Sequence, residues 1–378
     1  MKKINVIVSY RNRDVKLAKN CFESFKKQVF KDFQVVLVDY GSSDEYRKKI
    51  EELANSYSFV KYVYSYDEGR VWNRSRAMNI GIRESDCEYL LFADIDIVYS
   101  SNYLEMLWNK RAVDKSILNY VHYLRKDFTR IDGIIEGTYQ INQNDYESIA
   151  KVTGASTFIK KSIIEEVGGY DEYYCFWGVE DRDLRNRLDK SGNKQEWLEV
   201  GESYLYHQWH EVVSVGKKNF LPDRWWDDMN IYFEINSDKI KRNGENWGKK
   251  TNKEERKVLS SKTKEFICDF VYKADFISKF VEELKKLSDR ECLLIKIPKE
   301  VEIIHNKRED FVRKISNKLL KRFFPALQTV FKEKIVNEKD FQEQKDIKYV
   351  FWRLIINKKI ISDYYISEDD EYEYIKMM

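Results

Sequence analysis

Hydrophobic and polar positions follow two different rhythms over the first part of the chain. Short β-branched or aromatic runs, typical of buried strands, alternate with stretches whose hydrophobic residues recur at the spacing of an amphipathic helix. The pattern predicts strands at 4–9, 33–38, 60–64 and 89–93, and helices around 22–29, 46–57 and 75–82. Strands that alternate with helices favour an α/β fold, with a mostly parallel sheet flanked by helices.

The rest of the chain differs from this first region. Glycines interrupt the pattern from about 110 to 220 and predict loops and short elements there. We therefore expect one domain over 1–250, with halves at 1–110 and 110–250. Beyond 250, glycine and proline nearly vanish, lysine and glutamate dominate, and helical spacing returns. Residues 251–378 are predicted to form a mainly helical extension.

Polar residues follow three of the predicted strands at the point where each strand ends. The first strand ends in Ser9-Tyr10-Arg11, the second in Asp39-Tyr40-Gly41-Ser42, and the last in Asp94-Ile95-Asp96. In a parallel sheet, ligands bind at the carboxyl ends of the strands. The sequence therefore predicts a binding site where these three segments meet.

Asp94 and Asp96 are candidate ligands for a divalent cation. In an extended segment, two residues spaced by two point to the same side. Their carboxylate oxygens would bind one side of a cation whose other side holds the oxygens of a diphosphate. A single Asp-x-Asp pair also arises by chance as a polar turn, so this prediction depends on the other segments.

Two of the four histidines lie close together, in His207-Gln208-Trp209-His210 after the hydrophobic run 204–206. Imidazole can complete a site begun by carboxylates and favours manganese over magnesium. A lone histidine is more often structural than a ligand, and one of the two suffices for the metal. We predict His207 as the ligand and leave His210 as a contact to phosphate or water.

Aromatic residues stand directly before acidic ones near Glu180, where a helix is predicted to begin. Acidic residues in a first helical turn have an ordinary explanation, because they complement the helix dipole. Glu180 and Asp181, however, lie close to Trp177, and an aromatic face beside carboxylates suits a sugar ring. An ionised carboxylate near a hydroxyl group can remove its proton. We predict Asp181 as this general base, with Glu180 as the alternative.

Asp39 has two readings. It stands before a turn in which Gly41 allows unusual backbone angles. A carboxylate at this position can accept a hydrogen bond from the ring N–H of a base such as uracil. It can also simply cap the following helix. For Asp39 we favour the nucleotide.

Charge and composition limit the partners. Lys+Arg 67 against Asp+Glu 64 gives a net charge of +3, which does not indicate a nucleic-acid partner. The five cysteines are scattered without a Cys-x-x-Cys pair, which suits a reducing cytoplasm. The basic and hydrophobic stretch 311–334 can lie on the inner face of a membrane, although such a pattern more often packs on its own protein.

Four segments in this order resemble glycosyltransferases of the GT-A fold. The likeness is to the family-2 enzymes related to the β-1,4-galactosyltransferases and to chondroitin-polymerase-like bacterial enzymes. The segments are Asp39–Ser42, Trp72–Gly81, Asp94–Asp96, and Gly168–Asp171 leading into Trp177–Asp183. Together they cover roughly residues 1–215. One departure is Tyr40, where many relatives have a second aspartate.

The resemblance implies an inverting transfer of a sugar from a UDP-sugar to a hydroxyl group, with Mn²⁺ or Mg²⁺ as cofactor. Residues 1–110 would be the nucleotide-sugar half and 110–250 the acceptor half. The donor would contact Ser9, Tyr10 and Arg11, with uracil at Asp39 and the diphosphate near Arg76.

The resemblance also assigns roles to the acidic residues. Asp94 would lie at the ribose side of the donor and near the metal, Asp96 would ligate the metal, and His207 would complete the coordination. Trp177 and Glu180 would line the acceptor sugar. Asp181 would be the base.

The acceptor can be a polysaccharide, a lipid-linked glycan or a protein. Two other functions remain open. One is a non-catalytic protein of the same fold that binds a sugar or a nucleotide. The other is a metal-dependent nucleotidyltransferase, which would normally show a glycine-rich phosphate loop near the N-terminus.

Overall fold

The computed structural model describes most of the chain. The described residues are 2–152, 154–176, 178–211, 225–268, 273–288, 291–298, 349, 351–355, 361–369 and 372–378. The chain divides into two compact units, one of 1–218 with 224–256 and one of 219–223 with 257–378. The division therefore falls after residue 256 rather than after residue 250.

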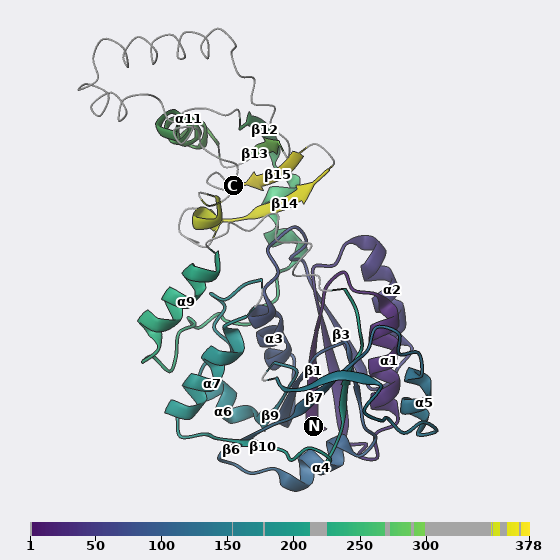
Figure 1. Ribbon diagram of the computed structural model, residues 1–378. Helices are drawn as coiled ribbons and strands as arrows, with labels where there is room; N and C mark the ends of the chain where they lie inside the picture. The colour runs from purple at the N-terminus through teal and green to yellow at the C-terminus, as the bar shows by residue number, and fades with distance from the viewer. Residues whose placement is uncertain are drawn as a thin grey trace, which may run out of the picture. The chain divides into compact units, whose positions relative to one another are not determined.

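The N-terminal unit is built on a seven-stranded sheet in the order β10-β6-β9-β4-β1-β2-β3 (Figure 1). Its strands are β1 (Lys2–Tyr10), β2 (Phe33–Tyr40), β3 (Val60–Ser65), β4 (Cys87–Ala93), β6 (Lys115–Leu118), β9 (Ser156–Lys160) and β10 (Lys194–Trp197). β1 runs parallel to β2 and β4, and β2 to β3, whereas β9 is antiparallel to β4 and β6. The mostly parallel sheet predicted from the sequence is confirmed.

Helices cover both faces of this sheet (Figure 1). They are α1 (Val15–Lys26), α2 (Asp44–Asn55), α3 (Arg74–Arg83), α4 (Tyr103–Lys110), α5 (Ile131–Glu136), α6 (Lys161–Glu166), α7 (Glu180–Lys190) and α9 (Trp225–Asn236). Because successive side chains of a strand point to opposite faces, β1 places Val6 and Val8 in the core with α1 and α2, and Ile7 in the core with α3, α6 and α7. Burial on both faces explains the continuous hydrophobic runs of these strands.

A second, four-stranded sheet has the order β5-β11-β7-β8. Its strands are β5 (Ile97–Tyr99), β7 (Tyr120–Leu124), β8 (Tyr146–Lys151) and β11 (Leu205–His207). β5 and β11 are antiparallel, with Ile97 opposite His207. Since β5 follows Asp96 directly, this pairing brings two distant parts of the chain together.

The C-terminal unit contains a four-stranded sheet in the order β12-β13-β15-β14. Its elements are α10 (Lys257–Ser260), β12 (Lys262–Ile267), α11 (Lys273–Lys285), β13 (Glu291–Pro298), β14 (Tyr364–Glu368) and β15 (Tyr372–Met377). The prediction of a mainly helical extension over 251–378 is therefore wrong for the described residues of this unit. In β15, buried Ile375 and Met377 alternate with less buried residues such as Lys376. This alternation is that of a strand with one buried face. The stretch 311–334 lies outside the described residues.

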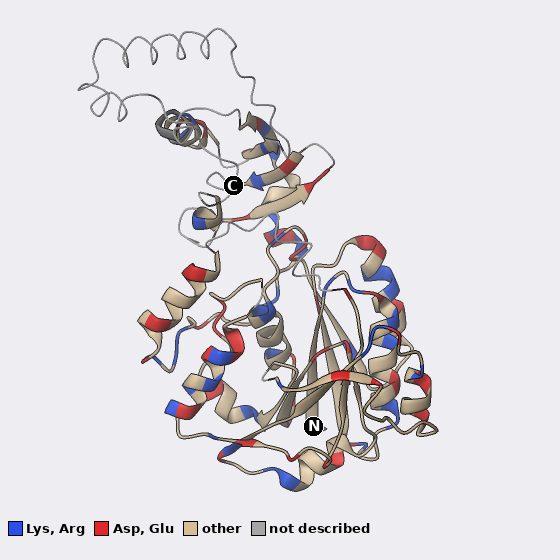
Figure 2. Ribbon diagram, viewed as in Figure 1, with Lys and Arg blue, Asp and Glu red and all other residues tan. Residues whose placement is uncertain are grey.

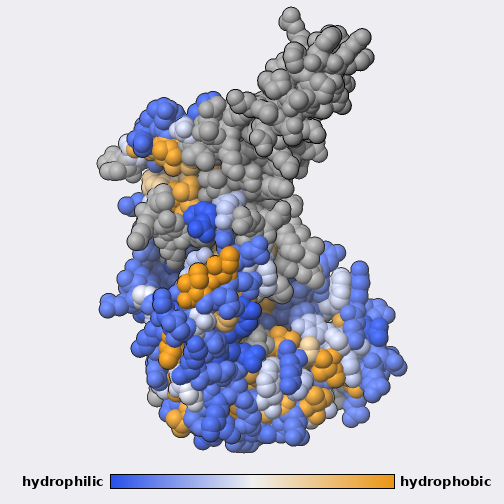
Figure 3. Space-filling view, turned by 60° about the vertical axis from the view of Figure 1, so that its left-hand side comes forward, coloured by the Kyte–Doolittle hydropathy of each residue, from blue (hydrophilic) through white to orange (hydrophobic). Residues whose placement is uncertain are grey.

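The described surface is mixed in charge. Basic and acidic side chains are interspersed over the helices of the N-terminal unit (Figure 2), which agrees with the small net charge of +3. On the face shown in Figure 3, hydrophilic residues dominate and hydrophobic ones gather in separate patches. Among the helices in the described ranges, none has the length and hydrophobicity needed to cross a bilayer.

Candidate active site

The carboxyl ends of β1, β2 and β4 lie side by side, as the sequence predicts. In the register of the sheet, Val8 is next to Ala93 and Tyr10 is next to Asp39. The polar segments that follow these three strands therefore begin at the same edge, which is where parallel sheets bind ligands.

Asp96, His207 and His210 form a group with the geometry of a metal site. Their ligand atoms all lie within 4.8 Å of one another. The Nε2 atom of His210 is 3.0 Å from Asp96 Oδ2, and the Nε2 atom of His207 is 3.7 Å from Asp96 Oδ1. From the sequence we predicted His207 as the ligand and His210 as a contact to phosphate or water, whereas the structure brings both imidazoles to the same carboxylate.

Gln208 holds the histidine segment in place. Its backbone N–H donates to the carbonyl oxygen of Asp96 at 2.8 Å, which continues the pairing of β5 with β11. Its buried side chain accepts a hydrogen bond from Asn20 Nδ2 at 2.6 Å and donates to the carbonyl oxygen of Leu17 at 3.1 Å. Because both partners belong to α1, the segment is tied to the helix that follows β1.

The electrostatics of this group suit a cation. Burial disfavours the charged form of Asp96, but the hydrogen bond with His210 and the neighbouring His207 and Arg13 outweigh burial and lower its pKa to about 2. Burial lowers the pKa of His207 and so favours its neutral form. The hydrogen bond to Asp96 raises the pKa of His210, so that a cation bound there would displace a proton from this imidazole. Metal binding needs an ionised carboxylate and neutral imidazoles. One carboxylate with two imidazoles is a donor set that fits Mn²⁺.

Asp94 has a different partner from Asp96. Residues 95 and 96 lie in a turn between β4 and β5, so the extended geometry predicted for Asp94-Ile95-Asp96 is wrong. The turn arises because β5 leaves the first sheet and joins the second. Asp94 Oδ1 accepts a hydrogen bond from Arg74 Nη2 at 3.0 Å. Asp94 is not part of the ligand group around Asp96, and its metal contact stays a prediction.

Arg74 connects Asp94 with the candidate base Asp181. Its Nη1 atom donates to Asp181 Oδ1 at 3.1 Å, and its Nη2 atom also donates to the carbonyl oxygen of Gly154 at 2.6 Å. No role was predicted for Arg74 from the sequence, although it lies within the segment 72–81 that carries the resemblance. The available signal was an arginine directly before the helix predicted at 75–82, where a positive charge opposes the helix dipole and so needs acidic partners.

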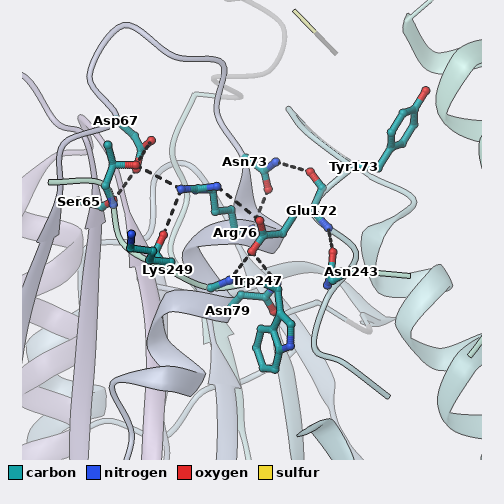
Figure 4. Close-up of polar contacts among 12 residues, drawn as sticks. Ser65, Asp67, Asn73, Arg76, Asn79, Glu172, Tyr173, Asn243, Trp247 and Lys249 are labelled. Atoms are coloured by element: carbon teal, nitrogen blue, oxygen red, sulfur yellow. Dashed lines mark hydrogen bonds and ion pairs between the residues drawn. The ribbon is translucent and has the colours of Figure 1, made fainter. Parts of the chain in front are cut away.

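Arg76, predicted near the diphosphate, faces another part of the unit. Two residues apart on an α-helix, side chains differ in direction by roughly 200°. The Nη2 atom of Arg76 donates to the carbonyl oxygen of Lys249 at 3.1 Å and to Thr251 Oγ1 at 3.2 Å, and its Nη1 atom lies 3.5 Å from Glu172 Oε2 (Figure 4). The structure thus brings Arg74, not Arg76, to Asp94 and Asp181.

Glu180 and Asp181 open α7 but have different surroundings. Glu180 is 6% exposed, and burial together with the charge of Asp181 raises its pKa to about 7. Asp181 is partly exposed and forms an ion pair with Arg74. Two carboxyl groups in such different environments can take different roles in acid–base chemistry. The ion-paired and more accessible Asp181 fits the base better, because a base must be ionised and within reach of its substrate.

Gly154 leaves space for the carboxylate of Asp181. A Cβ atom at this position would lie 2.2 Å from Asp181 Oδ2. Gly154→Ala is therefore expected to displace the carboxylate and to lower kcat by roughly 10- to 100-fold, because small misplacements of a catalytic group are costly. Steady-state kinetics measure the effect. A kcat equal to that of the wild type would show that the position of Asp181 does not matter.

The turn after β2 is held by Asp39, which is fully buried. Its Oδ1 atom accepts a hydrogen bond from the backbone N–H of Ser42 at 2.8 Å, and its Oδ2 atom accepts one from Tyr62 Oη at 3.0 Å. Burial raises the pKa of Asp39. The neighbouring Tyr10 donates its hydroxyl to the carbonyl oxygen of Arg13 at 2.6 Å. The base contact of Asp39 stays a prediction, and its present contacts stabilise the turn.

The other predicted donor contacts lie around this turn. Ser9 is half-buried near the end of β1. The guanidinium of Arg11 lies 5.9 Å from the ring centre of Tyr40, and its charge lowers the pKa of Asp39 against the larger effect of burial. The structure therefore brings Arg11 and Asp39 together. Trp177 lies outside the described residues.

Comparison with known families agrees with this architecture. Residues 5–168 match the sequence model of glycosyl transferase family 2, and residues 138–211 match that of the N-terminal domain of galactosyltransferase. Both matches lie within the N-terminal unit and include the segments that carry the acidic and histidine residues described above. The N-terminal unit is therefore similar to the family-2 glycosyltransferases and to the galactosyltransferases, the resemblance that the four sequence segments predicted.

Three relatives are similar to part of the chain. The chain is 27% identical to a GalNAc(5)-diNAcBac-PP-undecaprenol beta-1,3-glucosyltransferase of Campylobacter jejuni, over 46% of this chain and 57% of that protein. It is 25% identical to a cholesterol galactosyltransferase of Borreliella burgdorferi, over 43% and 45%. It is also 25% identical to a teichoic acid poly(glycerol phosphate) polymerase of Staphylococcus epidermidis, over 43% and 23%. The chain thus spans less than two thirds of the length of each.

Proposed function

We propose that this protein is an inverting glycosyltransferase that moves a sugar from a UDP-sugar to a hydroxyl group. The main support is the proximity of the metal-binding group to the candidate base. Arg74 joins the two groups, because its Nη2 atom donates to Asp94 Oδ1 at 3.0 Å and its Nη1 atom donates to Asp181 Oδ1 at 3.1 Å. Asp94 lies two residues before Asp96. This arrangement supports a candidate metal ligand and a candidate base on either side of one reacting centre, as transfer from a nucleotide diphosphate requires.

The donor would bind across the ends of β1, β2 and β4. Asp96, His207 and His210 would hold a divalent cation, with Mn²⁺ preferred over Mg²⁺ because two of the ligands are imidazoles. When bound, the cation would neutralise the charge of the departing diphosphate. Arg13, whose Nη1 atom lies 3.2 Å from His210 Nδ1, adds a fixed positive charge at the same place. The uracil base would lie near Asp39.

The reaction in this proposal is a single displacement. The acceptor oxygen forms a bond to the anomeric carbon while the bond from that carbon to the diphosphate oxygen breaks. Asp181 takes the proton of the acceptor hydroxyl. Attack from the face opposite the leaving group inverts the anomeric configuration. Arg74 positions Asp181 relative to Asp94, and Glu180 contributes a neutral carboxyl group that can hydrogen-bond the acceptor.

The acceptor would be a hydroxyl of a glycan, a lipid-linked glycan or a protein. By their names, two of the relatives act on cholesterol and on an undecaprenol-linked glycan, which supports a lipid-linked acceptor. Trp177 and Glu180 would line this acceptor. The reaction would take place in the cytoplasm, because the five cysteines are scattered without a Cys-x-x-Cys pair and suit a reducing compartment.

A donor screen tests the proposal. The full chain is incubated with a panel of UDP-sugars, with Mn²⁺ or with a chelator, and the release of UDP is measured. We expect release from one or a few UDP-sugars, loss of release with the chelator, and recovery when Mn²⁺ is added back. Release that is unaffected by the chelator contradicts the metal site. Binding of UDP without release from any donor indicates a non-catalytic protein, and release of pyrophosphate from a nucleoside triphosphate indicates a nucleotidyltransferase.

A further inference from the structure

Residues 243–256 form a segment that we call the strap. It follows α9 in the N-terminal unit and runs across α3 to the loop between β3 and α3, residues 65–70. Figure 4 shows the polar contacts that hold part of it. None of the roles predicted from the sequence falls on the strap itself.

Thr251 ties the strap to the loop 65–70. Its backbone N–H donates to Ser65 Oγ at 3.0 Å, and its carbonyl oxygen accepts from the backbone N–H of Tyr66 at 3.0 Å. Its hydroxyl donates to Asp67 Oδ1 at 2.9 Å. A single residue of the strap therefore uses its backbone and its side chain to hold three consecutive residues of the loop.

Two arginines complete the bonding of the Thr251 hydroxyl. Arg70 Nη1 and Arg76 Nη2 each donate to Thr251 Oγ1 at 3.2 Å. Both arginines also act on Asp67, whose carboxyl is fully buried and whose pKa is lowered by their charges despite its burial. The hydroxyl has one proton to give and two lone pairs to offer, and these contacts use all three. Removal of the hydroxyl would leave buried charged groups with fewer partners.

The loop 65–70 in turn lies directly against the turn after β2. A Cβ atom on Gly41 would lie 2.1 Å from the backbone nitrogen of Glu68 and 2.3 Å from the carbonyl carbon of Asp67. Gly41 also has a φ of +72°, which favours glycine. Arg256 Nη1 donates to the carbonyl oxygens of Tyr66 at 2.7 Å and of Glu68 at 2.8 Å. The strap thus holds the backbone of the loop 65–70, and this loop packs against the turn after β2.

The other end of the strap is fixed as well. The backbone N–H of Gly248 donates to Glu172 Oε1 at 2.6 Å, and the backbone N–H of Glu172 donates to Asn243 Oδ1 at 3.0 Å. A Cβ atom on Gly248 would lie 2.5 Å from the carbonyl oxygen of Asn79 in α3. With contacts on both sides of α3, the strap is a fixed support for the loop.

We propose that the strap is a positioning element for the nucleoside part of the donor. Through Asp67, Thr251 and Arg76 hold the loop 65–70 against Gly41 and so set the turn that carries Asp39. This inference rests on the proposed function, in which that turn binds the base. Arg76 then acts on the donor through the strap, while the cation and the diphosphate depend on a separate group of residues.

This division gives a distinctive signature. The strap supports the end of β2, whereas the metal-binding group lies at β5 and β11. A weakened strap should therefore lower the affinity for ligands that contain uridine. The affinity for a metal-bound diphosphate without a nucleoside should not change. A loss of fold would weaken both classes of ligand.

The variant Thr251→Val in the full chain tests the inference, because valine keeps the shape and removes the hydroxyl. Calorimetric titrations measure the binding of UDP, of uridine and of inorganic pyrophosphate, with Mn²⁺ present. We expect roughly tenfold weaker binding of UDP and uridine and unchanged binding of pyrophosphate. The KM for the UDP-sugar should rise by a similar factor with little change in kcat. Thr251→Ser, which retains the hydroxyl, should restore binding.

Two further variants complete the design. Arg76→Lys keeps the charge but loses the forked contacts to the strap. It should likewise weaken the binding of UDP and uridine and leave the binding of pyrophosphate unchanged. Thr263→Val makes the same chemical change in the C-terminal unit and should bind every ligand like the wild type. Wild-type affinities in both Thr251→Val and Arg76→Lys, or equal weakening for pyrophosphate, would overturn the inference. A wild-type protein that binds no UDP overturns the proposed function, and this inference with it.

Discussion

Asp181→Asn is expected to lower kcat for sugar transfer by about 10²- to 10⁴-fold, the usual contribution of a general base. Asparagine has the same shape and can still accept the hydrogen bond from Arg74, but it cannot take a proton. UDP affinity should stay close to that of the wild type, since Asp181 is assigned to the acceptor. UDP release from the active donor and a UDP titration measure the two quantities.

The control for this variant is Asp189→Asn, which makes the same change at an exposed position of the same helix, α7. It should retain full activity. Full transfer by Asp181→Asn would show that another group removes the proton, and Glu180 is the alternative.

Glu180→Gln separates the two candidates through pH. Burial and the charge of Asp181 raise the pKa of Glu180 from an ordinary 4.5 to about 7. Below pH 7 its side chain is mostly protonated, so glutamine should preserve most of the activity there if Asp181 is the base. A loss as large as that of Asp181→Asn would instead assign the base to Glu180. The rate is measured as a function of pH for both variants.

The raised pKa of Glu180 also makes the free energy of unfolding depend on pH. Between pH 4.5 and 7 the folded protein holds a proton on Glu180 that the unfolded chain has largely lost. The free energy of unfolding should therefore fall as pH rises through this window, and Glu180→Gln should remove that part of the slope.

Asp96→Asn is expected to raise the Mn²⁺ concentration for half-maximal activity by roughly 100-fold or more. Changes in the outer contacts of a metal site already cost 10- to 100-fold in affinity, and this variant removes the charged ligand itself. Direct Mn²⁺ binding, followed by electron paramagnetic resonance, gives a measurement that does not depend on turnover. Asp132→Asn, at an exposed position of α5, is the control. Unchanged Mn²⁺ affinity in Asp96→Asn would place the metal elsewhere.

The rim of the site was predictable because its signals are local. Each strand of the first half is a continuous hydrophobic run followed by polar residues, and parallel pairing brings those ends together without further information. Asp39 and Asp94 could therefore be placed at one edge from the sequence. The two histidines were recognised as a pair, but their relation to Asp96 depends on the pairing of β5 with β11, which joins segments far apart in the chain.

The contacts of the two arginines in α3 could not be predicted from local signals. Arg74 and Arg76 both lie in the segment 72–81, and nothing in their local sequence shows which one faces Asp94 and Asp181. The N-cap Asn73 sets the start of the helix and so its phase. The strap then covers the side to which Arg76 points. Their contacts differ because of packing partners that lie far away in the chain.

By itself, the sequence determined the α/β class, four of the seven strands of the first sheet and the acidic residues that follow them, because side-chain periodicity and strand ends are local properties. The tertiary structure decided which of these residues meet. Arg74 reaches Asp181 across 107 residues of chain, and Thr251 reaches Asp67 across 184. It also decided that the described part of the C-terminal unit holds a sheet. Contacts of such separation depend on the packing of whole elements, which no local pattern of residues specifies.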